Sequence, residues 1–123
     1  MAHDITALIG RDGVARVADL TDRVDRHTVG SWVAAGRLLR PHPGIVVLPE
    51  RADEWRVRAL AAVFATNGVL SHTSALAAWG LARPLPRLHV SVPAGRRAPV
   101  LDGVSTHRVQ RLDRTYRAAY PVT

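Results

Sequence analysis

Apolar residues near the start of the chain recur three or four positions apart, the spacing that places them on one face of a helix. They fall into three groups: Ile5, Leu8 and Ile9; Val17, Leu20 and Val24; and Val29, Trp32 and Val33. Gly10 follows the first group and Gly36 the third, and glycine commonly ends a helix. Asp25 precedes the third group as a typical N-cap residue. The pattern therefore predicts three short helices.

Two short apolar runs follow the third predicted helix. They cover residues 38–40 and 45–48, and the turn between them is Pro41-His42-Pro43-Gly44. Short runs separated by proline and glycine are typical of a β-hairpin. Three helices followed by a hairpin is the arrangement of a winged helix-turn-helix domain, whose third helix enters a DNA groove. The sequence therefore predicts such a domain over residues 1–49.

The second half of the chain begins with further helical patterns. In residues 53–66 an apolar stripe includes Trp55, Ala59 and Val63, and Asn67-Gly68 ends it. The segment SHTSALAAWG follows at residues 71–80. These patterns predict a pair of helices.

An alternating pattern follows the helix pair. Leu88, Val90 and Val92 alternate with polar residues, and residues 104–109 are predicted to pair with them as a second β-hairpin with a basic tip. Residues 50–123 therefore form a helix pair plus a β-hairpin annex. The predicted fold class is α+β, a winged helix-turn-helix followed by this small annex.

Arginine supplies all of the positive side-chain charge apart from histidine. The 123 residues contain 17 arginines, no lysine and 10 acidic residues, so the formal net charge is +7. Residues 50–123 carry eleven arginines against five acidic residues, whereas residues 1–49 carry six against five. This balance favours a polyanionic partner such as nucleic acid. The alternative is that arginine without lysine reflects a GC-rich genome and the charge is ordinary solvated surface.

Composition also bears on cofactors and on the cellular compartment. The chain has no cysteine, so disulfides and thiolate metal sites are excluded. No apolar run approaches the roughly 18 residues needed to cross a bilayer. The N-terminus, with Asp4 and no basic segment, differs from a signal peptide. We therefore expect a cytoplasmic protein that needs no cofactor and does not contact a membrane.

The outer face of the third predicted helix carries small or hydrogen-bonding residues. His27, Ser31 and Ala34 face away from the apolar stripe, and Gly30 lies to one side. Glycine inside a helix costs up to about 1 kcal/mol relative to alanine, so close approach to another surface is a reason to keep it. The predicted DNA-binding residues are Arg26, His27, Gly30, Ser31 and Ala34 on the helix, Arg37, Arg40 and His42 around the hairpin, and Arg96 and Arg97 at the tip of the second hairpin. The alternative is a winged helix used only for protein contact.

The segment SHTSA invites a catalytic hypothesis, because it contains nucleophiles beside a base. Neighbouring helical residues such as Ser71 and His72 do not face each other, however. A hydroxyl of Ser71 or Thr73 is instead an expected helix cap. The chain also lacks the lysine that a restriction-type nuclease core needs beside its acidic pair. We therefore expect no enzymatic activity.

Three histidines could meet on the second predicted hairpin. His89 and His107 would face each other across its strands, with His72 nearby. Their spacing predicts no common metal geometry, and histidine in a surface or pairing role is commoner. We therefore predict no metal site.

Two stretches of the sequence resemble a known family. GVARVADLTDRVDRHTVGSWVAAGRLLRPHPGIVVLP is similar to the N-terminal winged helix of AbiEi-type antitoxins, which are transcriptional regulators in type IV toxin–antitoxin systems. VLSHTSALAAWGL, followed by LHVSVP and VSTHRV, is similar to the segment that comes next in that family.

The resemblance implies a DNA-binding autorepressor that recognises inverted repeats in the promoter of its own toxin–antitoxin operon. It also implies that residues 50–123 include the start of a C-terminal antitoxin domain, which opposes a nucleotidyltransferase-like toxin. The alternative function is a protein-interaction module that binds such a toxin without touching DNA.

Overall fold

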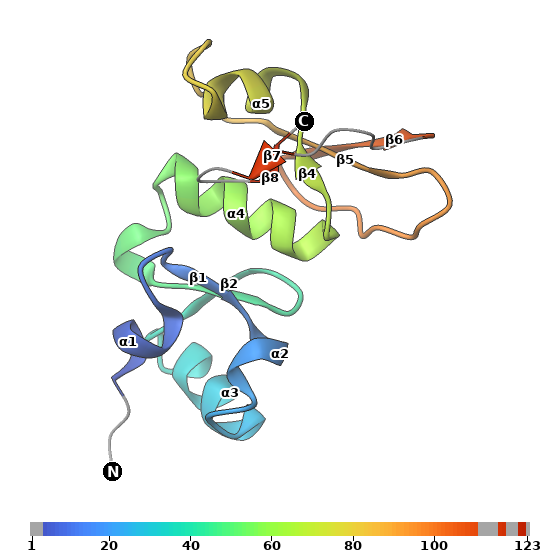
Figure 1. Cartoon of the computed structure of the whole chain (residues 1–123). Helices are drawn as coiled ribbons and strands as arrows, with labels where there is room; N and C mark the ends of the chain where they lie inside the picture. Colours follow the sequence, from blue (N-terminus) through green and yellow to red (C-terminus); the bar gives the residue numbers. More distant parts are fainter. Residues whose placement is uncertain (1–3, 111–115, 118–120, 123) are drawn as a thin grey trace. The chain divides into compact units, whose positions relative to one another are not determined.

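The structure, a computed structural model, describes residues 4–110, 116–117 and 121–122 (Figure 1). Its helices and sheets make a mixed α+β protein, so the predicted fold class is confirmed at this level. The chain divides into two compact units, residues 1–61 and residues 62–123. Among the described residues, no helix has the length and apolar character required to cross a membrane.

The first unit combines short helices with a small antiparallel sheet. Its elements are α1 Ile5–Ile9, β1 Val14–Arg16, α2 Val17–Leu20, α3 Arg26–Ala34, β2 Leu39–His42, β3 Ile45–Val47, the 3-10 helix η1 Pro49–Arg51 and the start of α4 Trp55–Thr66. In the described part of this unit the strand order is β1-β3-β2. The three predicted helices and the first hairpin are confirmed, but α2 ends at Leu20 and does not include Val24. Strand β1 is too short to show an alternating pattern, so the sequence does not predict it.

Both ends of α3 follow from its sequence. The side chain of Asp25 accepts a hydrogen bond of 3.0 Å from the backbone N–H of His27, which caps the first turn. At the other end Gly36 has φ +77°, and the N–H of Arg37 donates to the carbonyl of Trp32 at 2.8 Å. A left-handed glycine with this six-to-one hydrogen bond is a Schellman motif. The predicted cap and stop are therefore confirmed.

The core of the first unit lies under α1, α2 and α3. Its buried members are Ile5, Ile9, Val17, Leu20, Val24, Val29, Trp32, Leu38, Val46 and Leu48. Val29 is only 1% exposed and Trp32 is 9% exposed, whereas Val33 is partly buried. The predicted apolar stripe of α3 therefore faces this core, which determines which side of the helix faces outward.

The first hairpin differs in detail from its prediction. Strands β2 and β3 pair antiparallel, but β2 extends through Pro41 and His42, so the turn is confined to Pro43 and Gly44. Gly44 has φ +76°, a conformation that favours glycine. Because β2 lies at the edge of the sheet, the N–H that Pro41 lacks is not needed for pairing with a further strand.

The second unit is a helix and sheet assembly. Beside the end of α4 it contains β4 Val69–Leu70, α5 His72–Ala78, β5 Leu88–Pro93, β6 Val104–Val109, β7 Tyr116–Arg117 and β8 Pro121–Val122. In the described residues these strands form one sheet in the order β6-β5-β4-β8-β7. The core side of the sheet includes Leu88, Val90 and Val92, each at most 2% exposed.

The predicted second β-hairpin is wrong. Strands β5 and β6 are adjacent but parallel, with Leu88 opposite Val104 and Pro93 opposite Val109. Residues 94–103 carry the chain back along the sheet before β6 begins, as the orange loop in Figure 1 shows. A loop of that length can span about 33 Å, more than the length of a six-residue strand, so parallel pairing is possible without a helix. The alternation of apolar residues does not encode strand direction.

The turn between α4 and β4 requires a glycine. Thr66 ends the helix, as predicted, and Asn67 has φ +55°. A Cβ atom on Gly68 would lie 2.7 Å from the carbonyl oxygen of Ser91 and 2.9 Å from a methyl carbon of Val92. The absence of a side chain at Gly68 therefore allows the turn to pack closely on β5.

Candidate nucleic-acid interface

The outer face of α3 carries the residues that the sequence predicts there. Arg26, His27, Ser31 and Ala34 are exposed, and Gly30 is half-buried. They lie opposite Val29 and Trp32, which fill the core. The helix therefore presents a surface of small and hydrogen-bonding side chains, with a guanidinium at its first residue.

Two residues of this face have chemistry suited to close contact. Apart from Gly30, its chain neighbours and the backbone of α3 itself, no atom of the described residues lies within 4 Å of the position that a Cβ on Gly30 would occupy, so packing against the rest of the unit does not require glycine there. The hydroxyl of Ser31 donates to the carbonyl of His27 at 3.1 Å. Its proton is thus used within the helix, but its oxygen lone pairs can still accept from an amino group of adenine or cytosine.

Basic residues continue from α3 into the hairpin. Arg37 and Arg40 are exposed, the latter on the edge strand β2, and His42 is half-buried opposite Ile45. The chain contains no acidic residue between Asp25 and Glu50. Within the described residues, neither Arg37 nor Arg40 forms an ion pair. Positive charge on this segment is therefore not neutralised locally.

Other arginines of the first unit form ion pairs. Arg51 donates two hydrogen bonds to the Glu54 carboxylate, at 2.9 and 3.1 Å, and a third to the carbonyl of Arg11 at 2.6 Å. The hydrogen bond from Arg51 lowers the pKa of Glu54. Arg56 donates to Asp12 at 2.8 Å. These side chains connect α4 and η1 with the loop before β1, so their charge is already compensated.

Arg96 and Arg97 differ in their surroundings. The guanidinium of Arg96 donates to the carbonyls of Asn67, at 2.5 Å, and Thr66, at 3.4 Å, and its own carbonyl accepts from Arg108. Arg96 therefore connects the 94–103 loop to the end of α4, and these hydrogen bonds occupy part of its guanidinium. Arg97 is exposed. Sequence alone does not distinguish these neighbours, because only the folded loop brings one of them to free carbonyls.

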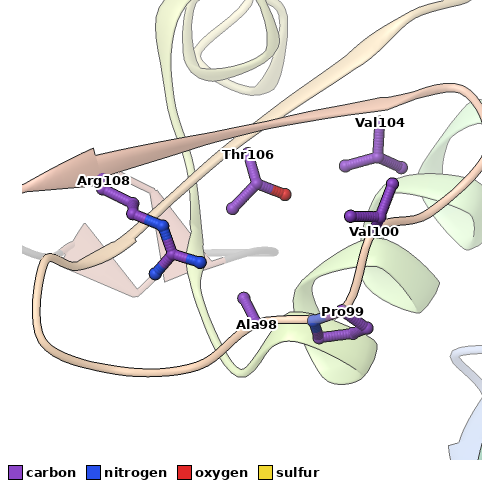
Figure 2. Close-up of a pocket in the computed structure, with 6 residues that line it drawn as sticks. All are labelled: Ala98, Pro99, Val100, Val104, Thr106 and Arg108. Atoms are coloured by element: carbon purple, nitrogen blue, oxygen red, sulfur yellow. The ribbon is translucent and has the colours of Figure 1, made fainter.

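A shallow cavity of about 210 Å³ lies between the same loop and β6 (Figure 2). Its lining is Ala98, Pro99, Val100, Val104, Thr106 and Arg108. Figure 2 shows Val100 beside Val104 at one end and Arg108 at the other. The Arg108 guanidinium is engaged with the loop carbonyl of Arg96. These lining side chains offer no pair of catalytic groups.

The cap predicted for the SHTSA segment is wrong in its chemistry. Ser71 occupies the N-cap position of α5, but its side chain makes no capping hydrogen bond. Its oxygen instead accepts from the hydroxyl of Ser91 at 2.8 Å, and both residues are buried. The hydroxyl of Thr73 is buried and has no hydrogen-bond partner among the described residues. The helix therefore begins with a link to β5, which a local cap pattern cannot reveal.

The histidines of the second unit do come together, on one face of a parallel strand pair. His89 Nδ1 lies 3.0 Å from His107 Nε2, and the ring centroid of His72 is 4.0 Å from that of His107. Burial lowers the pKa of both His89 and His107. Among the described residues, no group of three or more metal-ligating side chains, including these histidines, is arranged so that it could hold a metal ion.

No protein-family model matches the chain. A search of curated proteins finds no match either. A functional assignment therefore depends on the chemistry of the exposed surfaces, such as the segment from Arg26 to His42.

Proposed function

We propose that residues 1–49 form a winged helix-turn-helix domain that binds double-stranded DNA in a sequence-specific way and regulates transcription. The observation that carries this proposal is the outer face of α3, where small and hydrogen-bonding residues lie between Arg26 and Arg37. No acidic side chain interrupts the segment from α3 to the hairpin. The order of helices and strands agrees with that of winged helices.

In this proposal α3 enters the major groove, which is wide enough for a helix. Arg26, at the first residue of the helix, is placed to donate to a guanine edge, and Ser31 accepts from a base amino group. Arg37, Arg40 and His42 contact phosphates beside the groove. Gly30 and Ala34 keep the helix surface low enough for close approach.

The resemblance to AbiEi-type antitoxins extends the proposal. The chain would repress the promoter of its own toxin–antitoxin operon at inverted repeats, and it would act in the cytoplasm without enzymatic activity. Protein contact is the second candidate function, with a nucleotidyltransferase-like toxin as partner. It is favoured by apolar exposure on the second unit, where Leu76 and Trp79 are each 45% exposed and Leu81 is 74% exposed.

A binding titration at several salt concentrations tests the DNA proposal. Fluorescence anisotropy is measured with a labelled duplex from upstream of the gene and with a scrambled duplex of equal length. For about three to five phosphates contacted, the slope of log K against log salt is expected to be about −3 to −4.5, with tighter binding to the first duplex. A flat salt response, or no binding to either duplex, would contradict DNA binding and favour protein contact.

The substitution Gly30→Ala separates stability from DNA binding. Alanine fits at this helical position, because outside α3 no atom of the described residues lies within 4 Å of the position of its Cβ. We expect the free energy of unfolding to rise by up to about 1 kcal/mol, while affinity for the preferred duplex falls because the methyl group holds the helix away from the bases. Urea denaturation and anisotropy on the same variant check both effects. Unchanged DNA affinity in the stabilised variant would place Gly30 outside the interface.

A further inference from the structure

The histidine cluster of the second unit, His72, His89 and His107, joins three elements. His72 is the first residue of α5, His89 lies on β5 and His107 on β6. Because His89 pairs with Ser105 in a parallel register, residues 89 and 107 share one face of the sheet. Their ring centroids lie 5.2 Å apart, and that of His72 is 5.8 Å from His89. The proposed DNA-binding function uses none of these side chains.

The contact between His89 and His107 depends on protonation. Across the 3.0 Å between Nδ1 of His89 and Nε2 of His107, one nitrogen has to donate a proton and the other has to accept it. A neutral imidazole has one accepting nitrogen, whereas an imidazolium has none. If both rings are protonated, the hydrogen bond is lost and two cations face each other at the same distance.

Among the described residues, the charged side chains next to His89 and His107 in the sequence are basic. On β5 and the residue before it, the neighbouring charge is Arg87, which donates to Ser105 at 2.7 Å. Neither β4 nor the rest of α5 contains a titratable residue. On β6, Arg108 lines the cavity on the opposite face of the sheet (Figure 2). The chain has no acidic residue between Glu54 and Asp102.

Hydrogen bonds beneath the cluster tie α5 to β5. The N–H of His89 donates to the hydroxyl of Ser74 at 2.9 Å, and the N–H of Ser71 donates to the carbonyl of His89 at 3.0 Å. His72 itself has φ +53°, an uncommon conformation for a residue other than glycine. The start of α5 is therefore held in place by its contacts with β5 and β6 rather than by a local cap.

We propose that His72, His89 and His107 form a proton-sensitive latch, which holds α5 and the edge strand β6 on β5 while the imidazoles are uncharged and releases them on acidification. The ligand of the cluster is thus the proton. Protonation of both His89 and His107 removes the hydrogen bond between them, and protonation of all three rings adds mutual repulsion within the cluster. The released elements uncover the buried hydroxyl pair of Ser71 and Ser91.

The direction of the pH effect follows from proton linkage. Burial lowers the pKa of His89 and His107, and the positive charge of His72 lowers both further. The unfolded chain, with histidine pKa values of about 6.5, therefore binds more protons than the folded unit below that pH. Stability of the latch is complete above about pH 6.5 and is lost as the pH falls toward the lowered pKa values.

Residue-resolved amide hydrogen exchange on the whole chain tests the latch. Between about pH 7.5 and pH 5.5, after correction for intrinsic exchange, protection of amides in α5 and β6 is expected to fall about 10- to 100-fold, since each group contributes up to tenfold per pH unit. In parallel, NMR titration of the imidazoles is expected to place the midpoints of His89 and His107 below that of free histidine. Constant protection, or midpoints of both rings at the free value, would overturn the proposal.

Two substitutions sharpen the test. In His107→Gln an amide that cannot titrate replaces one ring, and the loss of protection with acid is expected to shrink to about tenfold per pH unit or less. His27→Gln, on α3, removes a histidine outside the cluster and is expected to leave the pH dependence of α5 and β6 unchanged. If His107→Gln does not fold, the NMR midpoints of His89 and His107 in the wild-type protein decide whether the latch exists. An equal effect of both substitutions would assign the pH dependence to histidine content rather than to the latch.

Discussion

Replacement of Trp32 by alanine is expected to lower the free energy of unfolding of the first unit by about 3 to 5 kcal/mol. The indole is 9% exposed and belongs to the cluster that contains Val29, Leu38 and Val46. Removing it takes away the largest side chain of that cluster and leaves a cavity that the short elements around it cannot close. The carbonyl of Trp32 also accepts the hydrogen bond that ends α3, so its helix turn and its side chain stabilise the same region.

Urea denaturation followed by circular dichroism measures this loss. Trp79→Ala is the matched control, because it removes the same side chain from a residue that is 45% exposed. The control is expected to cost much less than Trp32→Ala, since less surface leaves water there when the chain folds. Similar denaturation midpoints for Trp32→Ala and the wild type would show that the indole is not part of the core.

The local parts of the fold could be predicted from sequence because neighbouring residues determine them. Asp25 caps α3 through a residue two positions away, and Gly36 ends the helix with the carbonyl of a residue in its last turn. The burial of Val29 and Trp32 follows from helical periodicity alone. These features place the candidate DNA-binding face on the outside of α3.

The remaining parts depend on contacts between distant residues. Strand β1 is defined by pairing Val14 with Val47, and its three residues have no pattern of their own. The path of the 94–103 loop determines that β6 runs parallel to β5, and the alternation of apolar residues does not predict that direction. The hydroxyl oxygen of Ser71 accepts a hydrogen bond from Ser91, twenty positions away, instead of capping its own helix. Each error follows from a long-range partner taking precedence over a local rule.

For the candidate site, the sequence could predict which residues are exposed but not which hydrogen bonds they form. Sequence periodicity placed His27 and Ser31 on the outer face, where they lie. It could not show that the Ser31 hydroxyl donates to a backbone carbonyl, nor that Arg96 is held by carbonyls at the end of α4. The chemistry available to a ligand thus depends on internal hydrogen bonds that only the folded chain reveals.

Substitutions on α3 and on the hairpin are expected to affect DNA binding in different ways. Arg26→Ala or Ser31→Ala is expected to cost about 1 to 3 kcal/mol on the preferred duplex and much less on a scrambled one, because base edges differ between sequences. Arg40→Ala is expected to weaken both duplexes similarly and to make the salt slope shallower by about one unit, because phosphates are alike in every sequence. All titrations are made at one set of salt concentrations.

Replacement of arginine by lysine supplies the matched control for charge. Lysine keeps the positive charge but cannot donate two parallel hydrogen bonds from a planar fork. Arg40→Lys is therefore expected to retain the salt slope and most of the affinity, whereas Arg26→Lys is expected to lose much of the preference for one duplex. A melting curve for each variant shows whether a loss of binding reflects a loss of structure.

The pattern of outcomes decides the orientation of the domain on DNA. If substitutions at Arg26 and Ser31 weaken both duplexes equally while Arg40→Ala changes sequence preference, the hairpin reads the bases and α3 lies along the backbone. If no substitution on α3 or the hairpin changes DNA affinity, the exposed face from Arg26 to His42 is a protein-binding surface. We expect a loss of sequence preference from the α3 substitutions and a shallower salt slope from the β2 substitution. The reason is that α3 offers hydrogen-bonding groups on a low surface, whereas β2 offers an exposed guanidinium that forms no ion pair among the described residues.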